Sequence, residues 1–534
     1  MDRKLEFGLA AATIALFTGV GALVASDGFS GIKLTKSATA VSAKIDNEDE
    51  GYRPLQQAFL NELARRSGDI AAFEAAFEAG DELTEISFTA AQGIGAKVGE
   101  GRRFSRMPRP DLAGKGDWAT HLPKREGGPN ATSCIACHNS PGPNGAGDVA
   151  LNAVVDPGHT GDPKLFLERN TLPLLALGVP QRLAEEMSAE LADQKYLIFK
   201  QACDAGTSSG SLAAKGVDFG QIRVARKTEQ PCEVTVDWSG LEGIDRDLIV
   251  KPFGWKGNQP TIRAFTRNAA HNELGLQGVE LVADADGDHD GVANELTVGD
   301  MTALTIYMAA LERPVTKLEL AELGLIGVSS EEREAILQGE QTFQAIGCAT
   351  CHVPEMELKN TVFSEPSKTP GYFDVVFPSG EQPSTHNLTA ETAIKFDLAA
   401  DQPNNQIEQP NGKMVHLGAL KKTGNSENGS VGGETIAQWY SDFKRHDMGK
   451  ELADPADPLK IGASMWLTRS LAGVGSTGPW LHDGRATTLN EAIMAHGGEA
   501  FASRNTYSDL DQAERASLIT FLESLVIYKQ AEAE

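Results

Sequence analysis

The chain has 534 residues, 41% of them hydrophobic and 23% charged, which are values of a globular protein long enough for two or three domains. Its 48 basic and 74 acidic residues give a formal charge of −26. This excess of negative charge argues against a nucleic-acid-binding protein, whereas it suits simple solubility or a basic protein partner.

The N-terminal sequence predicts export. Arg3 and Lys4 precede an uncharged run from Phe7 to Ala25, and small residues follow, as in a secretory signal peptide. The run also approaches the length of a minimal membrane span, which leaves an uncleaved anchor as the alternative. We expect residues 1–26 to be this signal or anchor, residues 27–50 to be a linker, and the protein to be periplasmic.

The most informative pattern is the string Cys-x-x-Cys-His, which occurs twice. Its residues are Cys134, Cys137 and His138 in "NATSCIACHNSP", and Cys348, Cys351 and His352 in "QAIGCATCHVP". Paired zinc motifs usually lie about 15–20 residues apart, and a redox dithiol would need a thioredoxin-like βαβ context that the sequence lacks. The string is instead the attachment signature of c-type haem, in which both thiols bond the haem vinyl groups and the histidine binds iron. We therefore predict two covalently bound haem c groups.

The two remaining cysteines, Cys203 and Cys232, lie in a segment rich in Gly and Ser. In an oxidising compartment the simplest interpretation is a structural disulfide that closes a loop. Two buried free thiols are the alternative.

Apolar residues at helical spacing predict helices at 296–314, 329–346 and 508–525. The second begins with a capping-box pattern at Ser329 and Glu332 and leads directly to Cys348. Each haem string is followed, far downstream, by a helix with a similar apolar stripe. We therefore expect a mainly α fold of two cytochrome c-like haem domains with long loops and little strand. The domains would be residues 51–320, with an insertion around 200–250, and residues 321–534.

The segments "FGWKGNQPTIRAFTRNAAHNELG" (253–275) and "WLHDGRATTLNEAIMAHGGEA" (480–500) share one pattern, a glycine followed by threonine, a helical stretch and a histidine. With the haem strings and "RNTLPLLALG" (169–178), they make the chain resemble the di-haem cytochrome c peroxidase and MauG superfamily. Through "PFGWKGNQPTI", "FKRHDMG" and "HGGEAFASR" it is most similar to the di-haem oxidoreductase branch, regarded as thiol-oxidoreductase-like or as peroxidases. The resemblance covers the chain from about residue 75. It implies that peroxide reacts at the N-terminal haem and that electrons enter at the C-terminal haem.

The resemblance also implies a sixth iron ligand at the second haem. His496 stands where the family carries this ligand, which is usually Met in the peroxidases and Tyr in MauG, and Met448 and Met494 are its rivals. Two histidines would give a lower reduction potential than His and Met, since Met raises it. His482 and Arg485 of the "HDGR" turn are expected at the haem edge, where Arg can pair with a propionate. An ordinary salt-bridged turn is the alternative.

At the first haem, peroxidase chemistry requires an accessible iron and an acid/base group beside it. We expect His271 to be the sixth ligand or a pocket base, and Glu273 to be the catalytic carboxylate. The family's catalytic Glu lies downstream of a Trp-x-Gly turn, which Trp255 and Gly257 resemble. The rivals are Glu280 for the carboxylate, and His121 and His159 for the ligand.

The stretch "DADGDHDGVANELT" alternates oxygen ligands as a calcium loop does. The candidate ligands are Asp284, Asp286, Asp288, Asp290 and Glu295. The match to the EF-hand pattern is imperfect: counted from Asp284, His289 takes the place of the glycine, and counted from Asp286, Thr297 takes the place of the last ligand. Calcium, which di-haem peroxidases commonly hold between the haems, and a solvated acidic turn are both open.

These observations predict an exported di-haem c-type oxidoreductase of peroxidase type. Its partners would be hydrogen peroxide or another small oxidant, and a small redox protein such as cytochrome c as electron donor. The alternatives are a MauG-like oxidase of a protein or organic substrate, and a non-enzymatic electron carrier with both irons closed. The length disfavours a carrier, because simple carriers rarely need about 270 residues per haem.

Overall fold

The computed structural model describes residues 53–94, 130–155, 162–283, 291–373, 377, 381–400, 406–409, 411–421 and 435–529. The predicted signal peptide and linker lie outside these ranges. No helix within them is both long and apolar enough to cross a bilayer.

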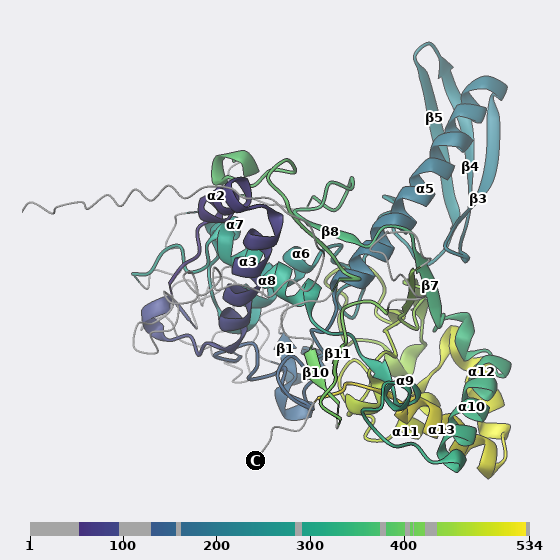
Figure 1. The fold of residues 1–534 in the computed structure, drawn as a ribbon. Helices are drawn as coiled ribbons and strands as arrows, with labels where there is room; N and C mark the ends of the chain where they lie inside the picture. The colour runs from purple at the N-terminus through teal and green to yellow at the C-terminus, as the bar shows by residue number, and fades with distance from the viewer. Residues whose placement is uncertain are drawn as a thin grey trace, which may run out of the picture. The chain divides into compact units, whose positions relative to one another are not determined.

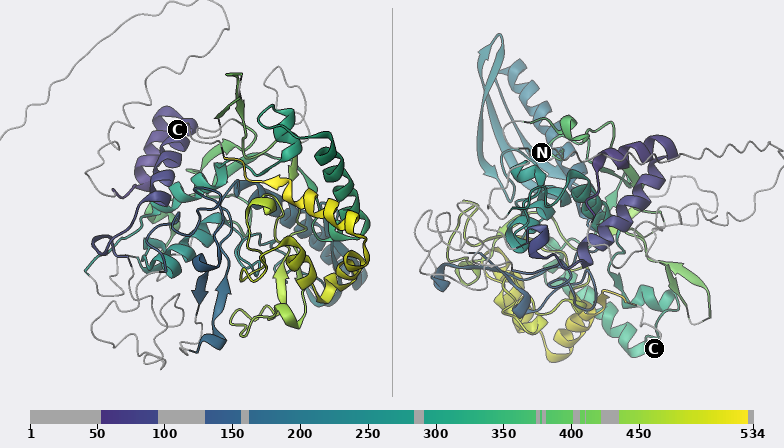
Figure 2. Two further views of the ribbon diagram at one scale, coloured as in Figure 1. Left: turned by 90° about the horizontal axis from the view of Figure 1, so that it is seen from below. Right: turned by 90° about the vertical axis from the view of Figure 1, so that its left-hand side faces the viewer.

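Helices and short strands alternate along the described chain (Figures 1 and 2). The α-helices are α2 (Gln57–Ser67), α3 (Asp69–Glu85), α5 (Gly178–Ala205), α6 (Ile262–Ala269), α7 (Val279–Val282), α8 (Val298–Ala310), α9 (Lys317–Glu322), α10 (Ser330–Ala345), α11 (Leu489–Ala495), α12 (Phe501–Asp509) and α13 (Gln512–Glu523). The strands are β1 (Ala153–Val155), β2 (Leu167–Arg169), β3 (Thr207–Ala214), β4 (Val217–Glu229), β5 (Cys232–Leu241), β6 (Val315–Thr316), β7 (Glu355–Leu358), β8 (Val362–Glu365), β9 (Ile394–Asp397), β10 (Gln406–Glu408), β11 (Met414–His416), β12 (Thr435–Gln438), β13 (Arg445–Asp447), β14 (Met465–Leu467) and β15 (Leu525–Val526).

The prediction of a mainly α fold with little strand is wrong. Of the described residues, 40% are helical and 19% are in strands, spread over many small sheets. Most of these sheets are antiparallel pairs of two to four residues, such as β13–β14 and β8–β9. Runs this short hold too few residues for a period of two to stand out in the sequence. Some pairs also join distant segments, as β7 joins β12 and β6 joins β15.

The largest sheet lies in the predicted insertion. β3, β4 and β5 pair in sequence order and lie along α5 (Figure 1). Along β4, Val217, Phe219, Ile222 and Val224 are buried, while Asp218 between them is exposed. Alternation of this kind is the mark of a strand with one buried face. The sequence therefore carried a strand signal here that the composition of the segment obscured.

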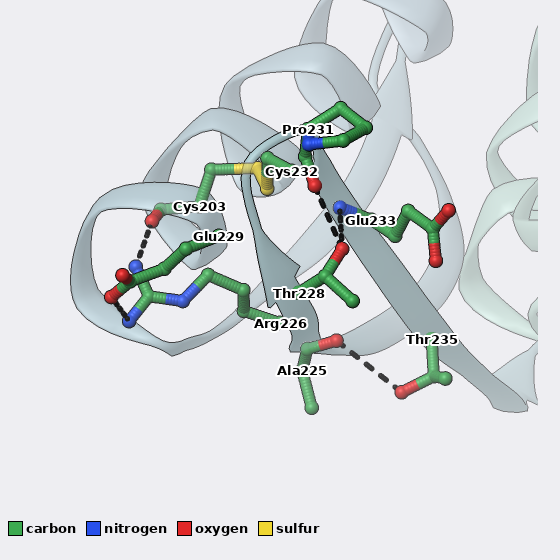
Figure 3. The surroundings of a disulfide bond; sticks show 9 residues. All are labelled: Cys203, Ala225, Arg226, Thr228, Glu229, Pro231, Cys232, Glu233 and Thr235. Carbon is green, nitrogen blue, oxygen red and sulfur yellow. Dashed lines mark hydrogen bonds and ion pairs between the residues drawn. A yellow bond between two sulfur atoms is a disulfide. The ribbon is translucent and has the colours of Figure 1, made fainter.

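A disulfide closes this α5–β5 arm, as predicted. Cys203, near the end of α5, bonds Cys232, the first residue of β5, with an S–S distance of 1.96 Å (Figure 3). Arg226 of β4 donates to the Cys203 carbonyl and lies 3.0 Å from the Glu229 carboxylate. The bond therefore joins the helix to the far end of the sheet that packs on it.

Two helix pairs organise the apolar interior, and all three predicted helices are confirmed as α8, α10 and α13. α3 packs on α8, and α10 packs on α13. A glycine lies at each contact: a Cβ on Gly80 would overlap the Ala303 carbonyl, and one on Gly339 would overlap the Ser517 carbonyl. Both helix pairs thus approach more closely than a larger residue would allow.

The apolar core continues across the predicted domain boundary. One cluster of buried residues extends from Leu60 to Ile527, and the partly buried ring of Phe396 packs against it, 4.5 Å from the ring of Phe73. A second cluster, from Ile336 to Leu525, belongs to α10, α13 and their neighbours. The division at residues 320/321 stays a prediction.

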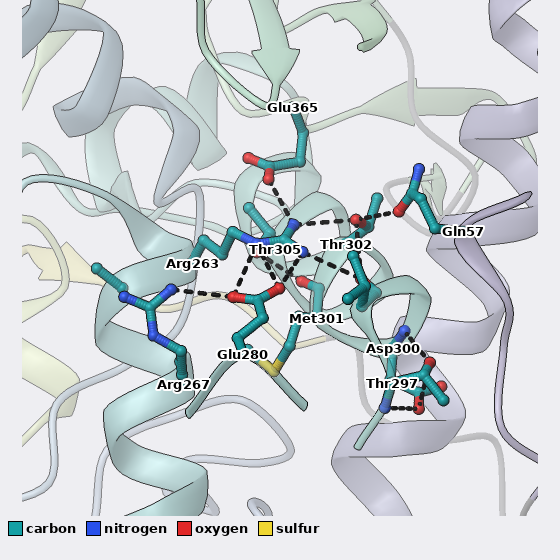
Figure 4. A network of polar contacts seen from close by, with 12 residues as sticks. Gln57, Arg263, Arg267, Glu280, Thr297, Asp300, Met301, Thr302, Thr305 and Glu365 are labelled. Carbon is teal, nitrogen blue, oxygen red and sulfur yellow. Dashed lines mark hydrogen bonds and ion pairs between the residues drawn. The ribbon is translucent and has the colours of Figure 1, made fainter. Parts of the chain in front are cut away.

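A buried charge network crosses the same boundary (Figure 4). Arg263 of α6 is 1% exposed and donates to Glu280, to Thr302 at 2.9 Å and to Glu365 of β8 at 2.7 Å. Arg267 Nη1 donates to Glu280 Oε2 at 2.9 Å. Burial raises the pKa of Glu365 to about 7, although Arg263 opposes the rise. Glu280 is therefore held by two arginines in a structural network.

Candidate haem-binding sites

The first Cys-x-x-Cys-His string forms a tight turn, in which the His138 backbone N–H donates to the Cys134 carbonyl at 3.0 Å. The thiols of Cys134 and Cys137 are not joined in a disulfide. His138 Nδ1 lies 2.7 Å from the carbonyl oxygen of Leu172, to which it donates. Burial lowers the pKa of His138 to about 4, so the ring is neutral. A neutral imidazole whose Nδ1–H is held by a carbonyl presents a bare Nε2, the form that binds a metal.

A cavity of about 50 Å³ adjoins this turn. Its lining includes Cys134, Cys137, His138, Phe265, Thr266, Glu273, Leu276, Leu304 and Met308. Two thiols and one imidazole at one cavity are the donor set that a c-type haem requires. Most of the other lining side chains are apolar, which suits the faces of a porphyrin ring.

Glu273 and His271 lie on one π-helical turn, Ala270–Leu274, and point to different surroundings. Glu273 lines the first cavity, and burial raises the pKa of its carboxyl to about 7. His271 does not line the cavity; burial lowers its pKa, and its Nδ1 has no hydrogen-bond partner among the described residues. The structure therefore brings Glu273, but not His271, to the first Cys-x-x-Cys-His turn.

The second string follows α10. The helix ends at Ala345, Gly347 turns the chain, and Cys348 begins a short 3₁₀ turn. Cys348 and Cys351 are not in a disulfide, and His352 Nδ1 lies 3.3 Å from the Tyr440 carbonyl oxygen. Burial, aided by His496, lowers the pKa of His352 to about 4.

The second cavity has a volume of about 360 Å³, within the range of ligand pockets. Its lining includes Leu172, Trp255, Cys348, Cys351, His352, His446, Met448, Trp466, His482 and His496. The space and the donor set both fit a haem.

His496 faces His352 across this cavity. The two ring centroids are 6.5 Å apart, and His496 Nδ1 lies 2.7 Å from the Ala492 carbonyl oxygen. Metal–nitrogen bonds of about 2 Å would place two imidazoles on opposite sides of one ion with centroids about 6 Å apart. Of the rivals, Met448 also lines the cavity, whereas Met494 is 40% exposed and does not.

In the "HDGR" turn, His482 lies at the cavity wall and Arg485 lies at the surface. His482 lines the second cavity and stacks on Trp466, with ring centroids 4.0 Å apart. Burial lowers the pKa of His482 to about 4. Arg485 is not part of the cavity lining; its side chain pairs with Asp483 and donates to the Glu451 carbonyl at 2.9 Å. The turn thus contributes its histidine, rather than its arginine, to this wall.

His446 is a cavity residue that sequence reasoning missed. Its Nδ1 lies 2.7 Å from Glu499 and its Nε2 lies 2.8 Å from Asp442. The available signal was the "FKRHDMG" motif, which indicated family resemblance but no role for the histidine. Its carboxylate partners lie 4 and 53 positions away, which no local pattern reveals.

One short segment touches both sites. The Leu172 carbonyl accepts the hydrogen bond from His138 of the first site, while Leu172 itself lines the second cavity. Two positions earlier, the Asn170 carbonyl accepts a hydrogen bond from Trp255 Nε1 at 2.9 Å, and Trp255 lines the second cavity as well. Residues 170–172 therefore contribute to both sites.

Several predicted residues lie outside the described ranges: His121, His159, Asp284, Asp286, Asp288 and Asp290. Glu295, the last candidate calcium ligand, is 3% exposed, and its Oε2 accepts from the Gln277 backbone N–H at 2.6 Å. The calcium site stays a prediction.

Comparison with known proteins identifies the C-terminal region. Residues 415–525 match the family described as "Di-haem oxidoreductase, putative peroxidase". No curated protein sequence matches the chain. A solved structure described as "Crystal structure of a MauG-like protein associated with microbial copper homeostasis" aligns at 13% identity over 66% of this chain and 89% of that chain, with a TM-score of 0.25. A likeness at this TM-score supports no conclusion about fold or function.

The matched region contains His446, His482 and His496, which line the second cavity. Its description agrees with the resemblance predicted from the sequence motifs. Residues 415–525 therefore resemble the di-haem oxidoreductase family, and this match agrees with the predicted resemblance to di-haem peroxidases and with haem as the implied cofactor.

Proposed function

We propose that the protein is an exported c-type di-haem oxidoreductase that reduces hydrogen peroxide. The observation that carries this proposal is the difference between the two cavities. The second presents an imidazole opposite its proximal histidine, whereas the first presents the buried carboxyl of Glu273. At the second site His352 and His496 would both hold the iron, which suits electron storage, whereas at the first site Glu273 would move protons during the reaction.

When bound, each haem would supply a redox-active iron; the two thiols of its string would bond the porphyrin and the proximal histidine would bind the iron. At the first site, the Glu273 carboxyl is positioned to take a proton from one peroxide oxygen and return it to the other. Its pKa of about 7 lets it do both near neutral pH. Two electrons and two protons then convert one hydrogen peroxide into two waters.

Electrons would enter at the second site from a small redox protein and pass to the first. The Leu172 segment and Trp255 provide one connection between the sites. The acidic chain, with a formal charge of −26, suits a basic donor.

Export is supported by two independent features. The N-terminal sequence has the organisation of a signal peptide. The Cys203–Cys232 disulfide is typical of an oxidising compartment such as the periplasm. An uncleaved anchor would give the same compartment with a membrane attachment.

A second candidate function is electron transfer without catalysis. Met308 lines the first cavity, and its thioether could close the iron there. Its sulfur accepts a hydrogen bond from the Thr266 hydroxyl at 3.6 Å, which holds it in its present place.

The test is electron paramagnetic resonance of the purified holoprotein, fully oxidised and then half-reduced, followed by a peroxide assay with reduced cytochrome c. We expect a high-spin ferric signal in at least one state and peroxide-dependent oxidation of the donor. Two low-spin signals in both states, with no peroxide reaction, would establish the carrier instead. Reaction with peroxide but no turnover of any redox-protein donor would favour a MauG-like oxidase.

A further inference from the structure

Two glycine-containing segments lie in direct backbone contact beside the second cavity. They are His446–Gly449 ("HDMG") and His496–Glu499 ("HGGE"). A Cβ on Gly497 would come within 2.9 Å of the Met448 carbonyl oxygen, and one on Gly449 within 3.0 Å of Gly498 N. A Cβ on Gly498 would overlap the Asp447 carbonyl. This close approach places the two rival sixth ligands, Met448 and His496, on adjoining segments.

His446 bridges these segments through its ring. Nδ1 lies 2.7 Å from Glu499 Oε2, and Nε2 lies 2.8 Å from Asp442 Oδ2. Because each ring nitrogen faces a carboxylate oxygen, each carries a proton and the ring is an imidazolium. Burial opposes this charge, whereas the two carboxylates that contact the ring stabilise it. The other Glu499 oxygen accepts from the Asp447 backbone N–H at 2.8 Å.

The bridge connects the supports of both histidines that face the second cavity. Asp442 comes two residues after Tyr440, whose carbonyl oxygen lies 3.3 Å from His352 Nδ1. Glu499 comes three residues after His496. The bridge Asp442–His446–Glu499 therefore runs from the proximal support to the segment that carries His496. Its Asp442 and His446 side chains are buried, whereas the Glu499 side chain is 55% exposed.

We propose that the Asp442–His446–Glu499 bridge is a positioning clamp that keeps His496, rather than Met448, as the sixth ligand of the second haem iron. This inference rests on the ligand assignment made under the proposed function. Met448 is the competing ligand because it lines the same cavity from the other side of the glycine contact. Breaking the clamp frees the His496 segment and lets the thioether of Met448 replace the imidazole.

The same cluster could be read as a separate metal site. A sulfur of Cys351, a carboxylate of Asp442 and a ring nitrogen of His446 lie within 4.8 Å of one another. A metal there would need the thiolate of Cys351 and an unprotonated His446. Haem attachment consumes that thiolate, and the two carboxylates stabilise the protonated ring, so the cluster serves the haem.

The test substitutes Glu499→Gln in the holoprotein. The amide keeps an oxygen for the Asp447 N–H but turns an NH₂ toward the His446 ring, which removes the ionic link. The matched control is Glu451→Gln, the same loss of charge at a side chain that is 82% exposed. Asp442→Asn breaks the other end of the bridge and is the second variant if Glu499→Gln fails to fold.

The readouts are the paramagnetic resonance signals of the oxidised protein and the reduction potential of the second haem. We expect Glu499→Gln to replace the bis-histidine signal with that of a His/Met haem and to raise the potential, since Met ligation raises it. Adding Met448→Leu to Glu499→Gln should then give a high-spin second haem. The first-haem signals should not change in any of these variants, which separates the effect from general unfolding.

Two results overturn the clamp. In the first, the wild-type second haem is bis-histidine and Glu499→Gln leaves its signal and potential unchanged. In the second, wild-type protein has no bis-histidine haem, and the ligand assignment of the proposed function fails with it. Peroxide activity can survive either result, so the clamp and the proposed catalysis fail in distinguishable ways. Stoichiometric binding of Zn²⁺ to the haem-loaded protein, lost in Asp442→Asn, would instead establish the metal site.

Discussion

At the scale of residues, a single turn determines which of two neighbouring side chains, Glu273 or His271, reaches the first cavity. Both were predicted for the first site, but the π-helical turn brings only Glu273 to the cavity. In a regular helix, positions two apart already face different directions, and the turn here is wider still. A sequence without its exact helix geometry cannot choose between them.

The first prediction concerns this pair. Glu273→Gln should lower kcat/KM for peroxide reduction by about 10²- to 10⁴-fold, because an amide cannot relay the proton. His271→Gln is the matched control on the same turn and should retain most activity. The measurement is steady-state peroxide reduction with both haems attached. Equal losses in the two variants would show that the turn matters as a structure and that Glu273 has no special role.

The second prediction concerns stability and pH. Burial raises the pKa of Glu273 from 4.5 to about 7, so the folded protein binds this proton more tightly than the unfolded chain does. The stability contributed by this carboxyl is complete below about pH 4.5 and is lost as pH rises through about 7. Glu273→Gln should therefore be more stable than wild type at pH 8, by up to about 3 kcal/mol, with the difference vanishing near pH 4.5.

Denaturant unfolding of both proteins across this pH range measures the difference. A constant offset between them would mean that Glu273 titrates normally and that its burial has been misjudged.

The six residues of the haem strings could be predicted because five consecutive positions contain the whole signature. His446 could not, because its role depends on Asp442 and Glu499 meeting it in space. His496 is intermediate: the resemblance suggested it, and its ring lies 6.5 Å from that of His352. A site residue can therefore be predicted from the sequence only where its role depends on residues next to it in the chain.

At the scale of elements, helices were predictable where their ends carry a cap. The Ser329 side chain accepts from Glu332 N at 3.1 Å, and α10 begins at the next residue after Ser329. The strands were missed for two reasons. Most are too short to show a period, and the longer β4 lies in a segment read by its composition as a loop-rich insertion.

The third prediction concerns the arm formed by α5 and β3–β5. Replacing Cys203 and Cys232 with serine removes a cross-link between positions 29 apart. Chain-entropy arguments put the loss at about 3–4 kcal/mol. Because the bond lies at the end of the arm, we expect faster hydrogen exchange in residues 200–240 and unchanged spectra at both haems. Exchange that stays at the wild-type rate would mean that packing on α5 alone holds the sheet.

At the scale of the whole molecule, the repeated sequence motifs and the contacts in the structure give different information about the domains. The sequence shows two haem strings, each with a closing helix, which suggests two domains. The structure adds contacts that no repeat reveals: the Phe73–Phe396 ring contact and the Arg263–Glu365 pair both join residues on either side of position 320. Two similar units can therefore share one core without any sign of it in the sequence.

The last prediction tests this coupling through Arg263. Arg263→Met should destabilise the protein by about 3–5 kcal/mol, because Glu280 and Glu365 lose the guanidinium they share while remaining buried. Arg223→Met is the control, since Arg223 is 66% exposed and lies 3.9 Å from Asp237; it should change little. Adding Glu365→Gln to Arg263→Met should recover part of the loss, because one buried charge is removed.

Unfolding followed separately at the two haems decides whether the contacts couple the halves. If the network holds them together, both haem signals of the wild type change at one denaturant concentration, and Arg263→Met lowers that concentration for both. Two separate transitions in the wild type would mean that each half unfolds alone, in which case Arg263→Met should affect mainly the first site. The buried arginine would then stabilise one haem domain, and the Phe73–Phe396 contact would be too weak to join it to the other.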